Sequence, residues 1–256
     1  MVRSYRTGGT GQDGHVASTR RGAARQADPV RYDFDFAVLL DYWPDFLAGA
    51  WVTLQLTFLA TVFGMAIGTL CAIGARGKRR WLARAIGIYV EIIRNTPFLI
   101  QIFFLYFGLA SAGLRLPVFT AAVIAMVFNV AAYCSEIIRA GMDTVHPGQI
   151  EAAQSLGMST PTIYWDVILR PAIERVYPAL TGQFVLMMLS SSVASQISTE
   201  ELTAVANNVQ SFTFRSLETF LAIAPMYLAL AALLKLSFWG IGLLAFPRRR
   251  RLGTAL

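Results

Sequence analysis

Five long apolar stretches constrain what this chain can fold into more than any other feature. They cover about residues 46–74, 87–112, 117–138, 178–197 and 218–246, and each is close to the ~20 residues that an α-helix needs to cross a bilayer. Lipid offers the backbone no hydrogen-bond partners, and the alternating pattern of barrel strands is absent, so helices are expected. With only 14% charged residues, a water-facing surface would be hard to build. The sequence predicts an all-α, polytopic membrane helix bundle with about five transmembrane helices.

Positive charges are concentrated at two places that five crossings would bring to the same side. Five basic residues lie between Arg76 and Arg84, after the first stretch, and Arg248–Arg251 follow the last one. Cytoplasmic loops carry the excess of Lys and Arg, so the C-terminus is predicted in the cytoplasm and the N-terminus outside. The arginines of the N-terminal tail oppose this orientation, but the residues nearest the first stretch include Asp41 and Asp45. The orientation accounts for the net charge of +7, and no nucleic-acid partner is predicted.

The chain divides into a polar tail, a membrane domain and a short basic end. Residues 1–40 predict a disordered N-terminal tail, residues 46–247 a transmembrane domain, and residues 248–256 a basic C-terminal tail. The Gly-rich run of the tail follows no strand and leads to no Gly-Lys-Ser/Thr, so it is not expected to bind phosphate. The sequence has no nucleophile–base set and no metal-ligand cluster. We therefore expect neither an enzyme nor a cofactor bound by this chain.

Gly64 and Gly68 form a Gly-x-x-x-Gly pair in the first apolar stretch. Small residues one turn apart let the backbones of two membrane helices approach closely. We expect another helix of the same bundle to pack against this face.

One polar segment, residues 142–171, separates the third and fourth stretches on the predicted cytoplasmic side. Pro147 suits the first turn of a helix, and Glu151 places a negative charge early in that helix, where it complements the helix dipole. Gly157 is placed to cap its end, and Pro161 then opens a second helix. The segment predicts two short helices joined by a corner. An ordinary amphipathic connector is the alternative interpretation.

The same segment resembles the Glu-Ala-Ala (EAA) loop of permeases from ATP-binding-cassette (ABC) importers. The resemblance is carried by Glu151-Ala152-Ala153, by Gly157 after three intervening residues, and by Val167-Ile168-Leu169. In that family the loop forms a cytoplasmic coupling helix that docks in a groove of the ATPase. The family usually has Pro directly after the Leu, whereas this chain has Arg170 before Pro171. The resemblance implies that the ATPase-coupling residues are Gly148, Glu151, Ala152, Ala153 and Gly157.

Three segments also resemble permeases of polar-amino-acid uptake systems, those of the histidine, glutamate, glutamine and opine type. They are residues 91–108, 133–149 and 190–203, within a resemblance that covers about residues 36–247. In the fourth stretch this chain has a Ser-rich run where the family often has a charged pair. The resemblance thus implies a permease domain for an amino acid, and leaves open which amino acid or opine is carried.

The resemblance further implies a transport mechanism and a set of partners. Substrate would cross the bacterial cytoplasmic (inner) membrane by alternating access, driven by ATP hydrolysis on a separate subunit. The implied partners are two ABC ATPase subunits, which would hold ATP and Mg, and a second permease subunit, identical or paralogous. A periplasmic or lipid-anchored substrate-binding protein and membrane lipid complete the set.

Polar residues within the apolar stretches are candidates for a gate or a substrate pathway. A charged side chain at mid-helix costs about 2.5–3.5 kcal/mol, so it needs a partner or water. Glu91 and Arg94 are three residues apart and can pair on one helical face, and Glu136 and Arg139 repeat this spacing. The full set of candidates is Glu91, Arg94, Asn95, Thr96, Gln101, Asn129, Glu136, Ser191, Ser192, Ser195 and Lys235.

Several of the polar residues in the apolar stretches have two interpretations. Amides such as those of Gln101, Asn129 and Gln183 either bond neighbouring helices together or line a route. The serines of the fourth stretch either contact substrate or allow tight packing. Lys235 either faces a cavity or extends to the membrane interface.

A stand-alone, ion-coupled secondary transporter is the alternative function. It would share the apolar helix bundle, but such transporters usually have more spans or an internal duplication. A membrane enzyme would need a cluster of His, Asp or Glu near one face, and the sequence has only His15 and His146 as histidines.

Overall fold

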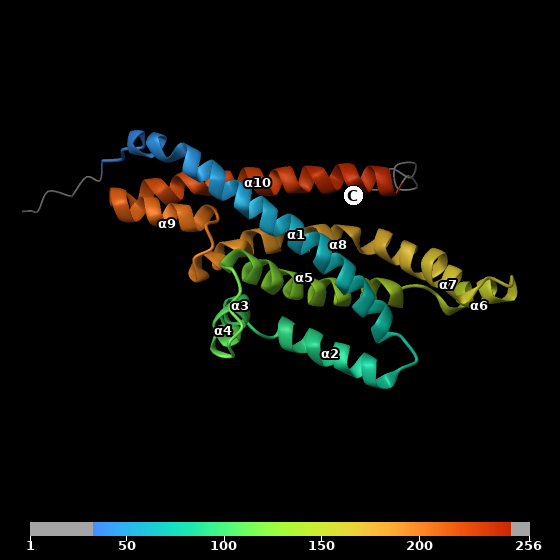
Figure 1. The fold of residues 1–256 in the computed structure, drawn as a ribbon. Coiled ribbons are helices and arrows are strands. Elements are labelled where there is room, and N and C mark those ends of the chain that lie inside the picture. The colour runs from blue at the N-terminus through green and yellow to red at the C-terminus, as the bar shows by residue number, and fades with distance from the viewer. Residues whose placement is uncertain (1–32, 247–256) are drawn as a thin grey trace, which may run out of the picture. The chain divides into compact units, whose positions relative to one another are not determined.

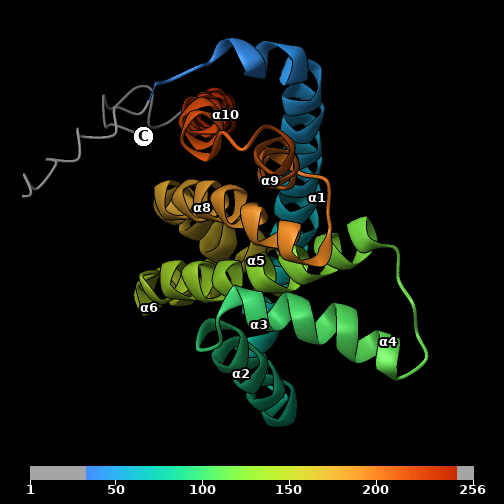
Figure 2. The ribbon, with the colours of Figure 1, turned by 90° about the vertical axis from the view of Figure 1, so that its left-hand side faces the viewer.

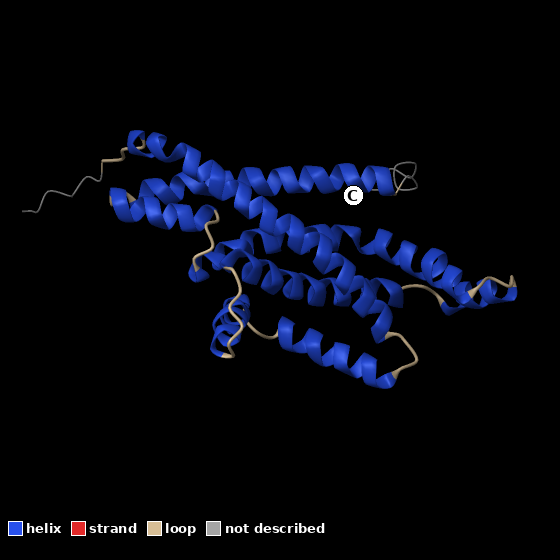
Figure 3. Ribbon diagram, in the orientation of Figure 1, coloured by secondary structure: helices blue, strands red, loops and turns tan. Residues whose placement is uncertain are grey.

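The computed structural model describes residues 33–246, and every regular element within them is a helix (Figure 3). The predicted all-α membrane bundle is confirmed for this part of the chain. The predicted tail up to residue 32 and the basic end from residue 247 lie outside the described residues. The expected tail boundary at residue 40 falls within the short helix η1, Ala37–Tyr42, which leads into the first crossing.

Four helical segments are long and apolar enough to cross a membrane. They are η1 with α1, Trp43–Ala75; α5, Val118–Asp143; a segment from Thr160 to Ile197; and α10, Ser216–Ala245. The third comprises α7, Thr160–Thr162, η3, Ile163–Leu169, α8, Arg170–Ser190, and η4, Ser191–Ile197. This crossing begins well before the expected residue 178, because its helix continues out of the segment predicted as the coupling loop.

The remaining crossing is broken. It consists of α2, Arg80–Arg94, and a second part over Phe98–Ser111, and the two parts differ in direction by 110°. The second part comprises α3, Phe98–Phe103, η2, Phe104–Gly108, and α4, Leu109–Ser111. The structure therefore differs from the single straight span expected over residues 87–112.

The break has a local cause in the sequence Asn95-Thr96-Pro97. Pro97 lacks a backbone N–H, and the residue before a proline avoids the helical conformation. Backbone carbonyls that a break leaves free must find partners within a membrane. Gln101 supplies them, because its Nε2 donates to the carbonyls of Ile93 at 2.7 Å and of Thr96 at 2.9 Å.

The first crossing packs most extensively against α5. A Cβ placed on Gly64 would lie 2.5 Å from Val130 Cγ1, and one on Gly68 would lie 2.6 Å from Cys134 Cβ. No side chain fits in either position without moving α5. The close helix contact predicted from this glycine pair is confirmed.

Two short helices lie at opposite ends of the bundle. Figure 1 shows α6, Pro147–Ser155, at the end where α1 is connected to α2, and α9, Leu202–Thr213, at the other end. In Figure 2 the helices α10, α8 and α5 lie in successive layers, with α3 and α2 beyond α5 and α1 alongside. The broken crossing therefore faces α5, and α8 lies on the next layer.

Candidate functional site

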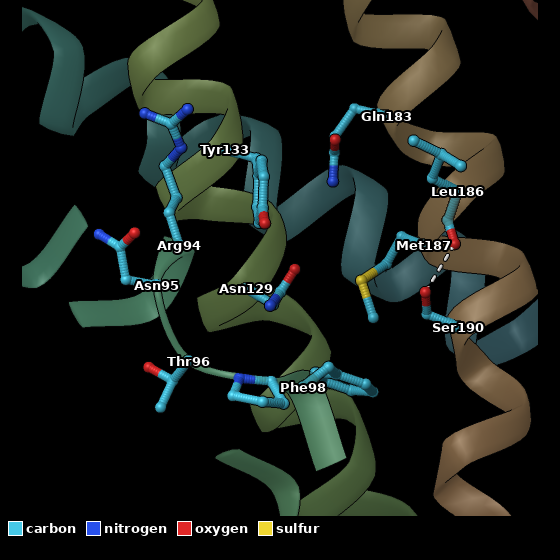
Figure 4. Close-up of a pocket in the computed structure, with 11 residues that line it drawn as sticks. Arg94, Asn95, Thr96, Phe98, Asn129, Tyr133, Gln183, Leu186, Met187 and Ser190 are labelled. Carbon is cyan, nitrogen blue, oxygen red and sulfur yellow. Dashed lines mark hydrogen bonds between the residues drawn. The ribbon is translucent and has the colours of Figure 1, made fainter. Parts of the chain in front are cut away.

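A polar cavity of about 520 Å³ lies where the broken crossing faces α5 and α8 (Figure 4). The break forms one wall, α5 contributes Asn129 and Tyr133, and α8 contributes Gln183 and Ser190. Its volume is within the roughly 300–1,000 Å³ of small-molecule sites. The complete lining is Arg94, Asn95, Thr96, Pro97, Phe98, Asn129, Tyr133, Gln183, Leu186, Met187 and Ser190.

The structure brings four of the predicted pathway residues together here, namely Arg94, Asn95, Thr96 and Asn129. Gln101 lies directly behind them, because Asn129 Nδ2 donates to Gln101 Oε1 at 2.9 Å. Asn129 thus combines the two alternatives for an amide in a span. It bonds two helices together and also lines the cavity.

Other candidates lie away from this cavity. The hydroxyls of Ser191, Ser192 and Ser195 donate to backbone carbonyls of their own helix at 2.6, 2.8 and 2.7 Å. Lys235 lines a separate cavity of about 480 Å³. Residues 178 and 182 of α8 line this second cavity, whereas residues 183, 187 and 190 line the first, so the two lie on different faces of α8.

Tyr133 is a lining residue that sequence reasoning missed, and Gln183 also lines the cavity. Figure 4 shows the two side chains reaching into the cavity from α5 and α8. Among residues 33–246, neither the Tyr133 hydroxyl nor the Gln183 amide has a hydrogen-bond partner. Both groups are therefore able to form hydrogen bonds with a molecule in the cavity. The available signal was spacing, since Tyr133 lies one helical turn from Asn129 on the same face of α5.

A network of ion pairs leads from the cavity to the end of α5. Arg94 Nη1 lies 3.8 Å from Glu136 Oε1. Glu136 and Arg139 form the pair that their spacing predicts, with contacts of 2.5 and 3.1 Å. Arg139 continues to Asp143 at 3.1 Å, and Asp143 is bonded to Arg76 at 2.5 Å. The network therefore joins the cavity to the turn after α1.

The pairing expected between Glu91 and Arg94 is not formed within the described residues. Arg94 is the last residue of α2, and it ends the helix at the break, so its side chain turns toward α5. The guanidinium carbon lies 5.7 Å from the centre of the Tyr133 ring, within cation–π range. Glu91 is exposed.

The predicted first helix of the coupling loop is α6, and its two ends follow the sequence signals. Pro147 occupies the first turn, and Nδ1 of His146 accepts a hydrogen bond from the Gly148 N–H at 3.1 Å. Gly157 follows the helix with φ +74°, the left-handed conformation that a C-terminal cap requires. The corner predicted at this glycine is confirmed.

One face of α6 packs against the bundle, and another face is exposed. Ala153 is 4% exposed and packs with Ile163 of η3 in the main apolar cluster. Glu151 and Ala152 are exposed, and Leu156 is 81% exposed. An apolar side chain beside a small residue and an acid is a surface suited to a protein partner.

The loop is also tied to the crossings on both sides of it. Arg175 Nη1 donates to the carbonyl of Thr144 at 3.2 Å and also contacts the hydroxyl of that residue. Ile168 and Leu169 are buried. The end of α5 and the first part of α8 are therefore fixed to each other beside the loop.

A buried carboxyl that sequence reasoning missed lies at the opposite end of the bundle. Glu201 is fully buried and caps α9 by accepting from the N–H groups of Thr203 and Ala204 at 3.0 and 2.8 Å. The hydroxyl of Tyr227 donates to it at 2.7 Å. Burial raises the pKa of Glu201, and these hydrogen bonds partly oppose that effect. An acid directly before an apolar helix was the available signal.

In the described part of the chain, no three His, Cys, Asp or Glu residues lie close enough together to hold a metal ion. The chemistry that the cavity offers is binding through amides, hydroxyls and one guanidinium. This arrangement can hold and release a small polar molecule.

Residues 64–247 match the binding-protein-dependent transport system inner membrane component. The nopaline transport system permease protein NocM of Agrobacterium fabrum is 35% identical over 205 residues, which cover 76% of this chain and 85% of NocM. The glutamine transport system permease protein GlnP of Escherichia coli K12 is 34% identical over 204 residues, covering 78% and 93%. The crystal structure of an amino acid ABC transporter with histidines matches with a TM-score of 0.75 and 36% identity, covering 82% of this chain and 99% of that one.

Proposed function

This chain belongs to the family of binding-protein-dependent transport system inner membrane components, and we propose that α6 couples a separate ATPase to a substrate pathway through the cavity between the broken crossing, α5 and α8. The chain is a multi-pass inner-membrane permease subunit of an ABC importer for an amino acid. Membership of this family supports ATP-driven import over the ion-coupled alternative. Relatives named for nopaline and glutamine favour a polar amino acid as the substrate.

The observation that carries the coupling proposal is the construction of α6. The helix is short, it is fixed to the bundle by Ala153, and it presents Glu151 and Leu156 outward. The left-handed Gly157 ends the helix and fixes the corner that follows it. A helix that couples two proteins needs both an exposed face for the partner and a firm contact with the membrane helices that move.

The proposed assembly contains two ATPase subunits, which bind ATP and Mg, and a second permease subunit, identical or paralogous. A periplasmic or lipid-anchored binding protein delivers the amino acid on the other side. In the proposed orientation α6 faces the cytoplasm and α9 faces outward. Arg76, Lys78 and Arg79 lie in the turn between α1 and α2, and Arg80 and Arg84 lie in the first part of α2. Figure 1 shows this connection at the α6 end of the bundle, which agrees with the proposed orientation.

Alternating access follows from the connections of the cavity. Its first wall is the break after α2, where Pro97 interrupts the helix hydrogen bonds. Its second wall, α5, leads by way of Arg139 and Asp143 to the loop that carries α6. Closure of the ATPase dimer around ATP would therefore act on the wall of the cavity through α5.

A glycine replacement tests the coupling role. We expect Gly157→Ala to strain the corner by about 1–2 kcal/mol, because alanine is disfavoured at this positive φ. The open space around Gly157 means that no clash adds to this effect. ATP-driven uptake of labelled glutamine or nopaline, measured in vesicles with the ATPase and binding protein present, should fall severalfold while membrane insertion stays normal.

Gly113→Ala is the matched control. Gly113 has φ +89° and open space around it, but it lies in the loop before α5, at the end opposite α6. The same backbone strain is thus introduced away from the proposed ATPase. Equal loss of uptake in both variants, or normal uptake in Gly157→Ala, would contradict the coupling role.

A further inference from the structure

Among the described residues, Arg94 is the only charged side chain that lines the 520 Å³ cavity. No carboxylate shares the lining with it, and the other polar groups are amides and hydroxyls. A cavity with one cation and no anion attracts a molecule that carries a negative group. The transported amino acid carries one in its carboxylate.

The donors of Arg94 are available. A guanidinium has five N–H donors in a planar fork, and that of Arg94 donates no hydrogen bond within residues 33–246. Its acidic neighbour Glu136 lies 3.8 Å away, beyond hydrogen-bond distance. Glu136 is instead engaged by Arg139 through both of its carboxylate oxygens. The planar fork of Arg94 is therefore open to a carboxylate of matching geometry.

The charge balance of the network points the same way. The connected residues are three arginines, Arg76, Arg94 and Arg139, and two acids, Glu136 and Asp143. The network thus has one positive charge more than it has negative charges. The excess lies at its cavity end, where Arg94 has the longest of the contacts. The carboxylate of an arriving amino acid would offset this charge at the cavity end, and its ammonium group would be left to the amides and hydroxyls of the lining.

We propose that Arg94 binds the carboxylate of the transported amino acid, and that Glu136 is the counter-ion that it exchanges for substrate. Glu136 remains paired with Arg139 after the exchange, so substrate binding leaves no acid without a partner. Release of the Arg94–Glu136 contact removes one tie between the end of α2 and α5, whereas the Gln101–Asn129 hydrogen bond remains. The inference rests on the proposed pathway and adds to it the group that recognises substrate.

Substitutions of Arg94 and of Glu136 should change the affinity for the amino acid in opposite directions. Arg94→Gln removes the carboxylate site, so the dissociation constant for the amino acid should rise about ten- to a hundredfold, the effect of losing a hydrogen-bonded charge. Glu136→Gln removes the competing anion, so binding should tighten severalfold. Arg94→Lys should retain part of the affinity because it keeps the charge and loses the fork.

Binding is measured on the complex of this permease with its ATPase, in lipid nanodiscs and without the binding protein, so that recognition by that protein does not contribute. The probes are labelled glutamine, nopaline and histidine, each with the corresponding carboxamide as a competitor that lacks the carboxylate. The carboxamide should compete poorly with wild type and almost equally with the labelled acid in Arg94→Gln. Arg115→Gln removes the same charge from an exposed loop and is the control.

A purely structural ion pair gives a different result, because both substitutions would then weaken binding or lower stability together. That outcome, or unchanged affinity in Arg94→Gln, overturns the inference. Failure of the proposed function is distinguishable, because wild-type complex with binding protein would then show no ATP-dependent uptake of any probe.

Discussion

Replacing Gly68 by alanine perturbs the close contact between α1 and α5. The new Cβ would lie 2.6 Å from Cys134 Cβ and 2.7 Å from the carbonyl oxygen of Ala131. Both atoms are fixed to the α5 backbone, so no change of rotamer can relieve the clash. Helices α1 and α5 would have to separate by as much as about 0.8 Å to restore ordinary contact near 3.4 Å.

The cost follows from two opposing effects. Overpacking of a tight contact typically costs about 1–3 kcal/mol, and separation of the helices also weakens dispersion along the whole seam. Alanine in place of glycine favours the helix by up to about 1 kcal/mol. We expect Gly68→Ala to lower the free energy of unfolding by about 1–2 kcal/mol.

Reversible unfolding in mixed micelles of mild and denaturing detergent measures this difference. Gly240→Ala in α10 is the control, because a Cβ there meets nothing within 4 Å and the variant reports the propensity gain alone. A Gly68→Ala protein as stable as the Gly240→Ala protein would refute the argument that the backbones of α1 and α5 are in contact.

Two further predictions concern buried polar groups. Burial raises the pKa of the Glu201 carboxyl, so the folded state binds the carboxyl proton more tightly than the unfolded state does. The protonated carboxyl therefore contributes its full stability below the ordinary pKa of glutamate, and this stability is lost as pH rises through the raised pKa of the folded state. Glu201→Gln should flatten that decline in thermal melts between acidic and neutral pH, and an unchanged pH dependence would contradict the assignment. Asn129→Leu removes the donor to Gln101 Oε1 and should cost about 0.6–2 kcal/mol in the same unfolding assay; no loss would mean that this bond does not hold α5 to α3.

The sequence was sufficient to predict elements whose cause is local. Apolar length predicted the crossings, Gly64 and Gly68 predicted a close helix contact, and Gly157 predicted the corner of the coupling loop. Each depends on residues within one or two turns of each other. Spans and caps of this kind need no knowledge of which helices become neighbours.

The break and the cavity depended on contacts between distant segments. Pro97 was visible in the sequence, but a proline in a span can kink a helix or end it, and the 110° change of direction is stabilised by Gln101 and by Asn129 on another helix. The same limit explains the pairing of Arg94. Spacing favoured Glu91, whereas the structure brings Glu136 of α5 to the end of α2.

The broken crossing also has a consequence for biosynthesis. α2 has 15 residues and is about 22 Å long, which is shorter than the ~30 Å hydrocarbon core. As the nascent chain emerges, this helix alone is too short to span the bilayer. The backbone carbonyls of Ile93 and Thr96 lack their hydrogen-bond donor until Gln101 has been made. α5 can cross by itself, whereas α2 and the part over Phe98–Ser111 are long and apolar enough only together. The two parts of the broken crossing are therefore expected to insert as a pair, and the hydrogen bond from Asn129 to Gln101 forms after α5 has been made.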